Sequence, residues 1–204
     1  HFRSLIDINS NEFIDIILKA IEYKELDKKN NIPNLFRNKT LAMIFKKNST
    51  RTRVAFETAM FKLGGHAIFL SEDSSQLKRG EDISDTARVL SGMVDLIMMR
   101  TNANEEIQKL AENSSVPIIN GLCNLFHPCQ LLADMQTITE VKGNSLSKLV
   151  IAWVGDGNNM CNSYINASKL LNFKLKISTP NGYEPDKYTL EKFGDNVEIC
   201  ELPG

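Results

Sequence analysis

The chain has 204 residues, of which 42% are hydrophobic and 24% are charged, and its formal net charge is −1. This composition predicts a soluble globular protein and excludes the global basic field of a nucleic-acid-binding protein. No apolar run approaches the roughly 20 residues of a membrane helix, so we expect no membrane-spanning segment. The four scattered cysteines contain no C-x-x-C pair, which favours a reduced, cytoplasmic protein over a disulfide framework or a zinc site.

Apolar residues recur with alternating helical and extended periods along the chain. The first helix is expected to include Phe13 and Ile17 on one face, with Asn9 or Ser10 as its N-cap. A polar segment at residues 71–81 is interpreted as a mobile loop. Further strands are predicted at residues 41–45, 66–70, 94–99 and 116–119, and further helices at residues 54–63, 82–93, 104–112 and 128–141.

Residues 142–145 interrupt this pattern and indicate a hinge or boundary. Strands are then predicted at residues 149–154, 175–179 and 197–200, and helices at residues 159–171 and 186–193. Repeated strand–helix alternation predicts an α/β protein with two doubly wound parallel-sheet domains. We assign them to residues 1–145 and 146–204. The second is shorter than the roughly 100 residues of a typical domain, so we expect it to be incomplete in this chain.

The run Ser-Thr-Arg-Thr-Arg at residues 49–53 lies between a predicted strand and a predicted helix. Free backbone N–H groups and the helix dipole favour an anion at such a turn. Arg51 can bind phosphate in a bidentate way, and the alternative is a helix cap beside surface arginines. Arg53 precedes Glu57 by four residues, which predicts a structural ion pair within the helix.

Three further residues stand where strands end or helices begin. Arg100 follows a predicted strand, and open α/β sheets bind ligands at that end, although a surface arginine fits equally well there. His127 precedes Pro128 at a helix start, with Gln130 one turn further on. A capping or packing histidine is the alternative interpretation. Cys129 is predicted to be a packed residue rather than a nucleophile.

The Gly-Asp-Gly-Asn-Asn turn at residues 155–159 begins like a dinucleotide-binding fingerprint. Met160 occupies the third glycine position, so the fingerprint fails and NAD binding is disfavoured. A turn that presents two asparagine amides to a small polar ligand fits better. The alternative is a turn built from Gly and Asn for backbone reasons alone.

Taken together and in this order, the motifs resemble the aspartate/ornithine carbamoyltransferase family, and its ornithine branch most closely. S-T-R-T-R at residues 49–53 with H-P-C-Q at residues 127–130 is a highly specific combination. The turn at residues 155–159 and the run T-P-N-G-Y-E-P at residues 179–185 favour the ornithine branch.

The resemblance implies an enzyme that transfers the carbamoyl group of carbamoyl phosphate to the side-chain amine of L-ornithine, giving L-citrulline and phosphate. It further implies a role in arginine metabolism, a homotrimer with shared active sites, and no metal or organic cofactor. Arg51, Arg100 and His127 are the implied catalytic residues. The implied binding residues are Ser49, Thr50, Arg51 and Thr52 for phosphate, Arg100, His127 and Gln130 for the carbamoyl group, Gln76 from a neighbouring subunit, and Asn159 for ornithine.

The family normally continues into S-M-G and H-C-L-P segments that are not found in these 204 residues. We therefore expect the chain alone to bind carbamoyl phosphate but to turn over poorly. Two alternatives stay open at this point. The acceptor could be putrescine, aspartate or a modified ornithine, or the chain could be a non-catalytic anion-binding module.

Overall fold

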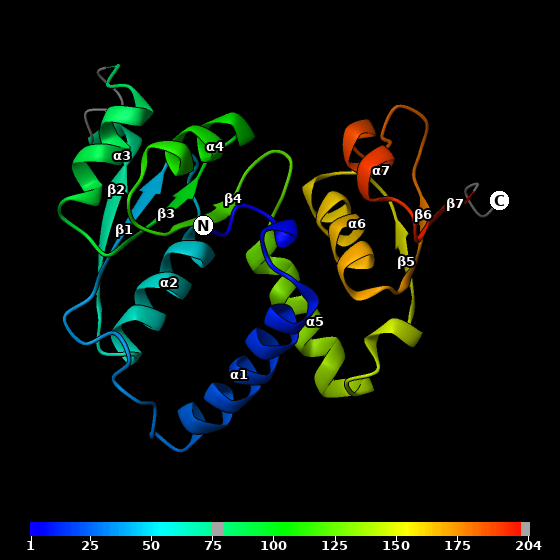
Figure 1. The fold of residues 1–204 in the computed structure, drawn as a ribbon, viewed down its shortest axis with the longest axis horizontal. Coiled ribbons are helices and arrows are strands. Elements are labelled where there is room, and N and C mark those ends of the chain that lie inside the picture. The colour runs from blue at the N-terminus through cyan, green and yellow to red at the C-terminus, as the bar shows by residue number, and fades with distance from the viewer. Residues whose placement is uncertain (75–79, 201–204) are drawn as a thin grey trace. The chain divides into compact units, whose positions relative to one another are not determined.

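The computed structural model describes residues 1–74 and 80–200. By its internal contacts the chain divides into two compact units, one of His1–Arg3 and Tyr23–Cys123, the other of Ser4–Glu22 and Asn124–Gly204 (Figure 1). Each unit contains one parallel sheet. The domain boundary expected at residue 145 stays a prediction.

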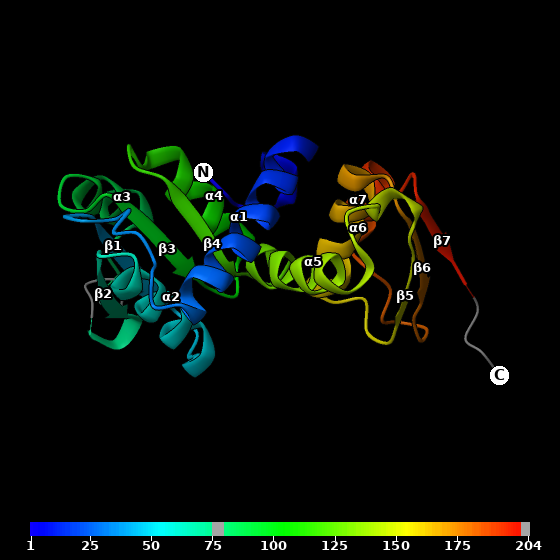
Figure 2. The same cartoon turned by 90° about the horizontal axis from the view of Figure 1, so that it is seen from below.

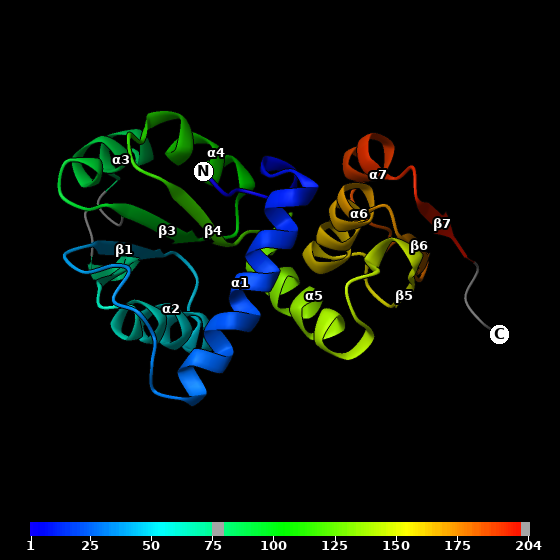
Figure 3. The same ribbon diagram turned by 60° about the horizontal axis from the view of Figure 1, so that its bottom comes forward.

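The first unit is built on a four-stranded parallel sheet in the order β2-β1-β3-β4. Its strands are β1 (Thr40–Phe45), β2 (His66–Ser71), β3 (Leu96–Arg100) and β4 (Ile118–Leu122). The connecting helices are α2 (Thr50–Lys62), α3 (Ile83–Ser91) and α4 (Asn104–Asn113). Figure 3 shows α2 on one face of the sheet and α3 and α4 on the other. The chain therefore winds outward in opposite directions from β1 and β3, whose carboxyl ends form a topological switch point.

One core cluster of this unit lies between the sheet and α2. Leu41, Met43 and Phe45 of β1 are buried together with Met60 of α2 and Met98 of β3. Both faces of β1 are apolar because helices cover both faces of the sheet, as in other parallel sheets. The predicted strand at residues 41–45 is confirmed with one added residue, Thr40.

The predicted start of the second helix was wrong. The structure begins α2 at Thr50, whereas the apolar pattern placed its start at Val54. Ser49 is the N-cap, with its Oγ accepting from the Thr52 N–H at 3.2 Å. Hydroxyl and arginine side chains are tolerated in a first helical turn, where they can serve the exposed N–H groups, so apolar periodicity does not detect that turn.

The strands differ from their predicted bounds by one to three residues at an end, and β3 and β4 differ most. Arg100 is the last residue of β3 rather than the residue after it. β4 covers Ile118–Leu122, displaced toward the C-terminus from the expected residues 116–119. The outer edge of β4 receives the N-terminal segment, because Phe2 forms a parallel bridge with Ile119.

α1 (Ser10–Lys28) crosses the division between the units at residue 22. Of the two expected N-caps, Asn9 and Ser10, the structure selects Asn9. The Asn9 side chain accepts from the N–H groups of Asn11 and Glu12 at 3.0 Å each, and Glu12 accepts in return from the Asn9 N–H at 2.8 Å. This reciprocal pair is a capping box, which explains the helix start. A short turn, η1 (Leu5–Asp7), precedes it.

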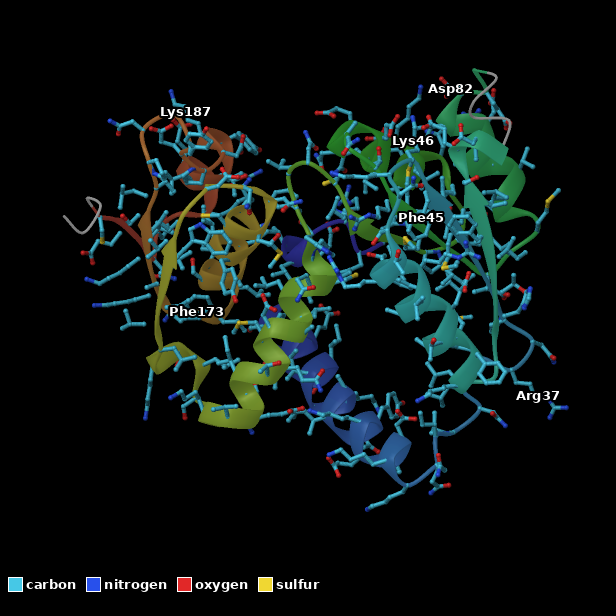
Figure 4. The ribbon with its side chains drawn as sticks, turned by 180° about the vertical axis from the view of Figure 1, so that it is seen from behind. Arg37, Phe45, Lys46, Asp82, Phe173 and Lys187 are labelled. Atoms are coloured by element: carbon cyan, nitrogen blue, oxygen red, sulfur yellow. The ribbon has the colours of Figure 1, made fainter. Side chains whose placement is uncertain are left out.

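The second unit contains a three-stranded parallel sheet in the order β5-β6-β7. Its elements are α5 (Pro128–Lys142), η4 (Leu146–Lys148), β5 (Val150–Val154), α6 (Asn159–Leu171), β6 (Lys174–Ser178), α7 (Lys187–Phe193) and β7 (Val197–Ile199). α6 and α7 lie on one face of this sheet (Figure 2). Phe173 is fully buried in this unit and is labelled in Figure 4. The predicted α/β class with parallel sheets is confirmed.

The loop expected at residues 71–81 is described only in part. Ser71 ends β2, and Glu72–Ser74 form the short turn η2. Residues 75–79 lie outside the described part of the chain. Within residues 1–74 and 80–200, no helix is both long enough and apolar enough to span a bilayer.

Candidate functional site

The switch point of the first unit gathers hydroxyl and guanidinium groups. Ser49 caps α2, and its Oγ donates to Thr52 Oγ1 at 3.0 Å while accepting from the Thr52 N–H. Thr52 Oγ1 also accepts from Nη1 of Arg100 at 3.2 Å. The sequence separates Thr52 and Arg100 by 48 residues, and the switch point brings them into contact. Thr50 and Arg51 are the first two residues of α2, so their N–H groups lie at its positive end.

An irregularity in the sheet lies directly at Arg100. Phe45 and Arg100 are register partners, and the Lys46 N–H donates to the Arg100 carbonyl at 2.9 Å. On the other side of β3, Met99 pairs with Asn120 whereas Arg100 pairs with Leu122, so one residue of β4 is extra. Such bulges change the direction of the side chains beside them and are frequent next to functional sites.

The electrostatics of Arg100 indicate a site for an anion. Burial lowers the pKa of its guanidinium, and the positive charge of Arg51 lowers that pKa further. Its Nε is buried and has no hydrogen-bond partner within residues 1–74 and 80–200. Two cations that disfavour one another near a helix N-terminus are stabilised by an anion bound between them.

Arg53 makes different contacts from Arg51. Its Nε donates to Glu57 Oε1 at 2.9 Å, and its guanidinium carbon lies 3.8 Å from the centre of the Phe69 ring. The predicted structural ion pair is confirmed. An open depression of about 500 Å³ lies over this surface and reaches the start of α2, lined in part by Ser49 and Thr50.

His127 and Asn159 begin two helices of the second unit. His127 is the N-cap residue of α5, with Pro128 following at the first helical position. Its backbone N–H donates to Ser163 Oγ at 2.9 Å, and Ser163 Oγ donates to the Asn159 carbonyl at 2.7 Å. The structure therefore connects these two predicted residues through Ser163, which the sequence interpretation did not include. The signal was its position one turn after Asn159 on the same helix face.

Gln130 contacts Asp134, which in turn contacts Tyr164, and the sequence interpretation missed both partners. Its Nε2 donates to Asp134 Oδ1 at 2.9 Å, and Asp134 Oδ2 accepts from the Tyr164 hydroxyl at 3.2 Å. Burial and the neighbouring carboxylate both raise the pKa of Tyr164, so the phenol stays a donor. The i, i+4 spacing of Gln130 and Asp134 could have identified the first contact.

Some residues of the turn at 155–159 serve the backbone: one caps a helix, and another forms a backbone hydrogen bond. Asn158 caps α6, accepting from the N–H of Met160 at 2.9 Å, so only Asn159 of the expected amide pair is outside the capping contact. The Gly157 N–H donates to the Tyr183 carbonyl at 2.8 Å. A Cβ on Gly157 would lie 2.3 Å from the Pro185 nitrogen, which explains the glycine.

The remaining predicted residues divide into two cases. Gln76 lies outside the described residues. Burial raises the pKa of the Cys129 thiol to about 12, which disfavours the reactive thiolate. Among residues 1–74 and 80–200, no three His, Cys, Asp or Glu side chains are grouped to hold a metal ion.

Two family models match the chain. The carbamoyl-P binding domain of aspartate/ornithine carbamoyltransferase matches residues 1–140, and the Asp/Orn binding domain of that family matches residues 147–201. The chain belongs to the aspartate/ornithine carbamoyltransferase family. The first match contains Arg51, Arg100, His127 and Gln130, and the second contains Asn159.

Comparisons with individual relatives also place this chain in the carbamoyltransferase family. It is 52% identical over 203 residues to the ornithine carbamoyltransferase of Hydrogenovibrio crunogenus, covering 100% of this chain and 67% of that relative. The structure of ornithine carbamoyltransferase from Pyrococcus furiosus superposes with a TM-score of 0.91 at 43% identity, covering 98% of this chain and 66% of that one. The aspartate transcarbamoylase catalytic subunit of M. jannaschii is 33% identical with a TM-score of 0.82, covering 97% and 66%. The chain thus spans about two thirds of the length of these relatives.

Proposed function

We propose that this protein transfers the carbamoyl group of carbamoyl phosphate to the side-chain amine of L-ornithine, giving L-citrulline and phosphate in arginine biosynthesis. The observation that carries the proposal is the contact of Arg100 with Thr52 at the start of α2, where the charge of Arg51 also acts on Arg100. Ornithine is favoured over aspartate because the relatives named for ornithine include one 52% identical, against 33% for the aspartate enzyme.

The phosphate end of the substrate is assigned to the start of α2. The free N–H groups of the first helical turn and the hydroxyls of Ser49, Thr50 and Thr52 are donors suited to phosphate oxygens. Arg51 adds a full positive charge. When the bond between the carbamoyl carbon and its bridging oxygen breaks, phosphate takes the electron pair and its negative charge rises. These donors stabilise that charge.

The carbonyl end is assigned to Arg100, His127 and Gln130. The neutral amine of ornithine attacks the carbonyl carbon, a C–N bond forms, and negative charge grows on the carbonyl oxygen before phosphate departs. The attacking nitrogen loses one proton to solvent or phosphate. Donors preorganised toward such an oxygen are worth roughly 3–4 kcal/mol each in other enzymes. The Asp134 and Tyr164 contacts hold the Gln130 amide in one orientation.

We also propose a homotrimer with shared active sites, in which Gln76 reaches a neighbouring subunit. Support comes from exposed apolar side chains of α2 and of the edge strand β2. Val54 and Phe61, seven residues apart on α2, are 55% and 81% exposed, and Ile68 of the edge strand β2 is 38% exposed. Burial of such a surface against a second copy is favourable. We also propose a cytoplasmic location, because the four scattered cysteines contain no C-x-x-C pair.

The central assignment is tested by Arg51→Gln. Carbamoyl phosphate is titrated into the protein by calorimetry, and we expect Kd to rise by at least about tenfold because one charge-assisted contact is lost. Arg53→Gln is the matched control, since that arginine already pairs with Glu57. It should bind within about twofold of the parent protein. Equal affinities for the parent protein and Arg51→Gln would refute the assignment.

The acceptor is tested separately in the full-length gene product. Labelled carbamoyl phosphate is supplied with ornithine, aspartate or putrescine, and the carbamoylated product is followed. Ornithine should give the highest kcat/KM. A preference for aspartate or putrescine would replace the proposed acceptor and leave the carbamoyl-phosphate site intact.

A further inference from the structure

Lys46, which lies between β1 and the segment Ser49–Thr52, contacts two other segments. It follows β1 and precedes Ser49 by three residues, and its N–H donates to the Arg100 carbonyl at 2.9 Å. Its Nζ donates to Glu106 Oε1 at 2.5 Å and lies 3.5 Å from Glu72 Oε1. Figure 4 labels Lys46 and its neighbour Phe45 at the end of β1. One side chain thus links the segments that follow β1, β2 and β3.

Glu106 completes a closed circuit of contacts around Arg100. It lies in the first turn of α4, and its second carboxylate oxygen accepts from the Thr101 hydroxyl. Thr101 directly follows Arg100, is 1% exposed, and donates its N–H to the Leu122 carbonyl at 3.0 Å. Arg100 is therefore fixed at its carbonyl by Lys46 and through its next residue by Glu106.

The Lys46–Glu106 pair is better shielded from water than other ion pairs of the described residues. Both side chains are 23% exposed, whereas Arg88 and Asp85 are 62% and 63% exposed. Partly buried pairs are screened less by salt and hold their geometry better than exposed ones. A carboxylate that accepts from a lysine and a buried hydroxyl is also restricted in rotation.

We propose that the Lys46–Glu106–Thr101 bridge is a positioning element that holds the Arg100 guanidinium against the Ser49–Thr52 cradle. This inference rests on the proposed function, because it concerns the same carbamoyl-phosphate site. The contact from Arg100 Nη1 to Thr52 Oγ1 is 3.2 Å long and joins the end of β3 to the start of α2. Small displacements between such groups cost large factors in binding and rate. None of the three bridge residues needs to touch the substrate.

The test compares Glu106→Gln and Thr101→Val with Glu105→Gln. Gln at position 106 cannot accept from both donors, and Val at position 101 keeps the shape of Thr without its hydroxyl. Glu105 is the adjacent exposed carboxylate of the same helical turn, so its replacement makes the same change of charge. Thermal unfolding of each protein identifies any variant that fails to fold, and the two bridge variants break the circuit independently.

Calorimetry measures Kd for carbamoyl phosphate and for inorganic phosphate. Both bridge variants should bind carbamoyl phosphate about tenfold more weakly and inorganic phosphate less than about threefold more weakly, because Arg100 is assigned to the carbonyl end. Glu105→Gln should bind both as the parent protein does. In an Arg100→Ala background, Glu106→Gln should cause no further loss, since its effect acts through Arg100.

The outcomes separate the two proposals. A parent protein that does not bind carbamoyl phosphate overturns the proposed function. A parent protein that binds, together with an Arg100→Ala variant that is weakened and folded bridge variants that are not, overturns only the positioning role. The positioning role would also be overturned if the bridge variants lost equal affinity for carbamoyl phosphate and for phosphate, and lost it in the Arg100→Ala background too. That result would indicate that the bridge has only a structural role.

Discussion

Two arginines that are two residues apart illustrate how context assigns roles at the residue scale. Arg53 pairs with Glu57 four residues on, and this was predictable from spacing alone. Arg51 is in α2 and its charge lowers the pKa of Arg100 at the end of β3, and only the fold brings the two residues together. Lys46 was not singled out for the same reason, because its partner Glu106 is 60 residues away. Spacing reveals contacts within one helix and does not reveal contacts between loops.

Ser49→Ala tests the cap of α2. The change removes the acceptor of the Thr52 N–H and the donor to Thr52 Oγ1. We expect the free energy of unfolding in urea to fall by about 1 kcal/mol, as for other N-caps. Ser49→Asn keeps a capping acceptor and should recover most of that stability. An unchanged urea midpoint for Ser49→Ala would contradict the capping role.

At the scale of the element, helix positions were predictable and helix starts less so. Apolar periodicity identified α2 but missed its first turn, Thr50–Arg53, because polar residues serve equally well there. Where a capping residue is recognisable from its chemistry, as at Asn9, the start was predicted correctly. The register shift at Arg100 was not predictable, because it depends on how two strands pair.

The turn at residues 155–159 is tested by Gly157→Ala. The added Cβ would meet the Pro185 nitrogen at 2.3 Å, which is backbone and cannot move aside easily. We expect a loss of about 1–3 kcal/mol in unfolding free energy, the usual cost of overpacking. Gly92→Ala is the control, because its Cβ would have only an ordinary contact of 3.5 Å with the Val89 carbonyl. Equal unfolding free energies for the two variants would show that the backbone near Pro185 moves to accommodate the added Cβ.

A carboxylate that precedes β3 and accepts from the first residue of β1 gives a pH-dependent prediction. Asp95 accepts from Lys39 at 2.7 Å and from the Thr40 N–H at 2.8 Å. Lys39 and then this N–H hold the pKa of Asp95 below its usual value. A lowered folded-state pKa means stability that is present at neutral pH and lost as the pH falls below about 4.

Asp95→Asn should therefore unfold at lower denaturant than the parent protein at pH 7. The difference between them should shrink as the pH is lowered through 4 and below, in a series of urea titrations. Asp15→Asn, an exposed carboxylate of α1, should show no such difference at pH 7. A stability difference between the parent protein and Asp95→Asn that stays constant with pH would rule out ionisation of Asp95 as its cause.

At the scale of the whole molecule, the fold class followed from strand–helix alternation, and the family followed from motifs in a fixed order. Parallel topology implied that Thr52 and Arg100 converge at a switch point, but it did not predict the distance between them. The contacts of Ser163, Asp134 and Tyr164 in the second unit were not predicted. They depend on the packing of α5 against α6, which periodicity does not specify.

Assembly gives the prediction at this scale. In sedimentation velocity, the parent protein should form a particle of three 23.0-kDa chains. Phe61→Glu places a charge in the exposed apolar surface of α2 and should shift the distribution toward smaller species. Val141→Glu is the control, because that valine is 72% exposed on α5 in the other unit. A parent protein that sediments as a single chain would exclude the trimer for these residues.

The extra residue of β4 makes chain length, as well as residue type, a sensitive variable beside Arg100. Gly121 occupies the skipped position, and a Cβ there would lie 2.5 Å from Met98 Sδ, so the position also admits little besides glycine. A deletion at residue 121 would restore a regular ladder in which Arg100 and Leu122 stay partners, and it would remove the local bend that the bulge gives to the strand. Libraries that vary residues 120 and 122 but keep the length of β4 would leave Arg100 in place. Insertions or deletions in β4 would change the direction of the Arg100 side chain, although β4 itself is assigned no substrate contact.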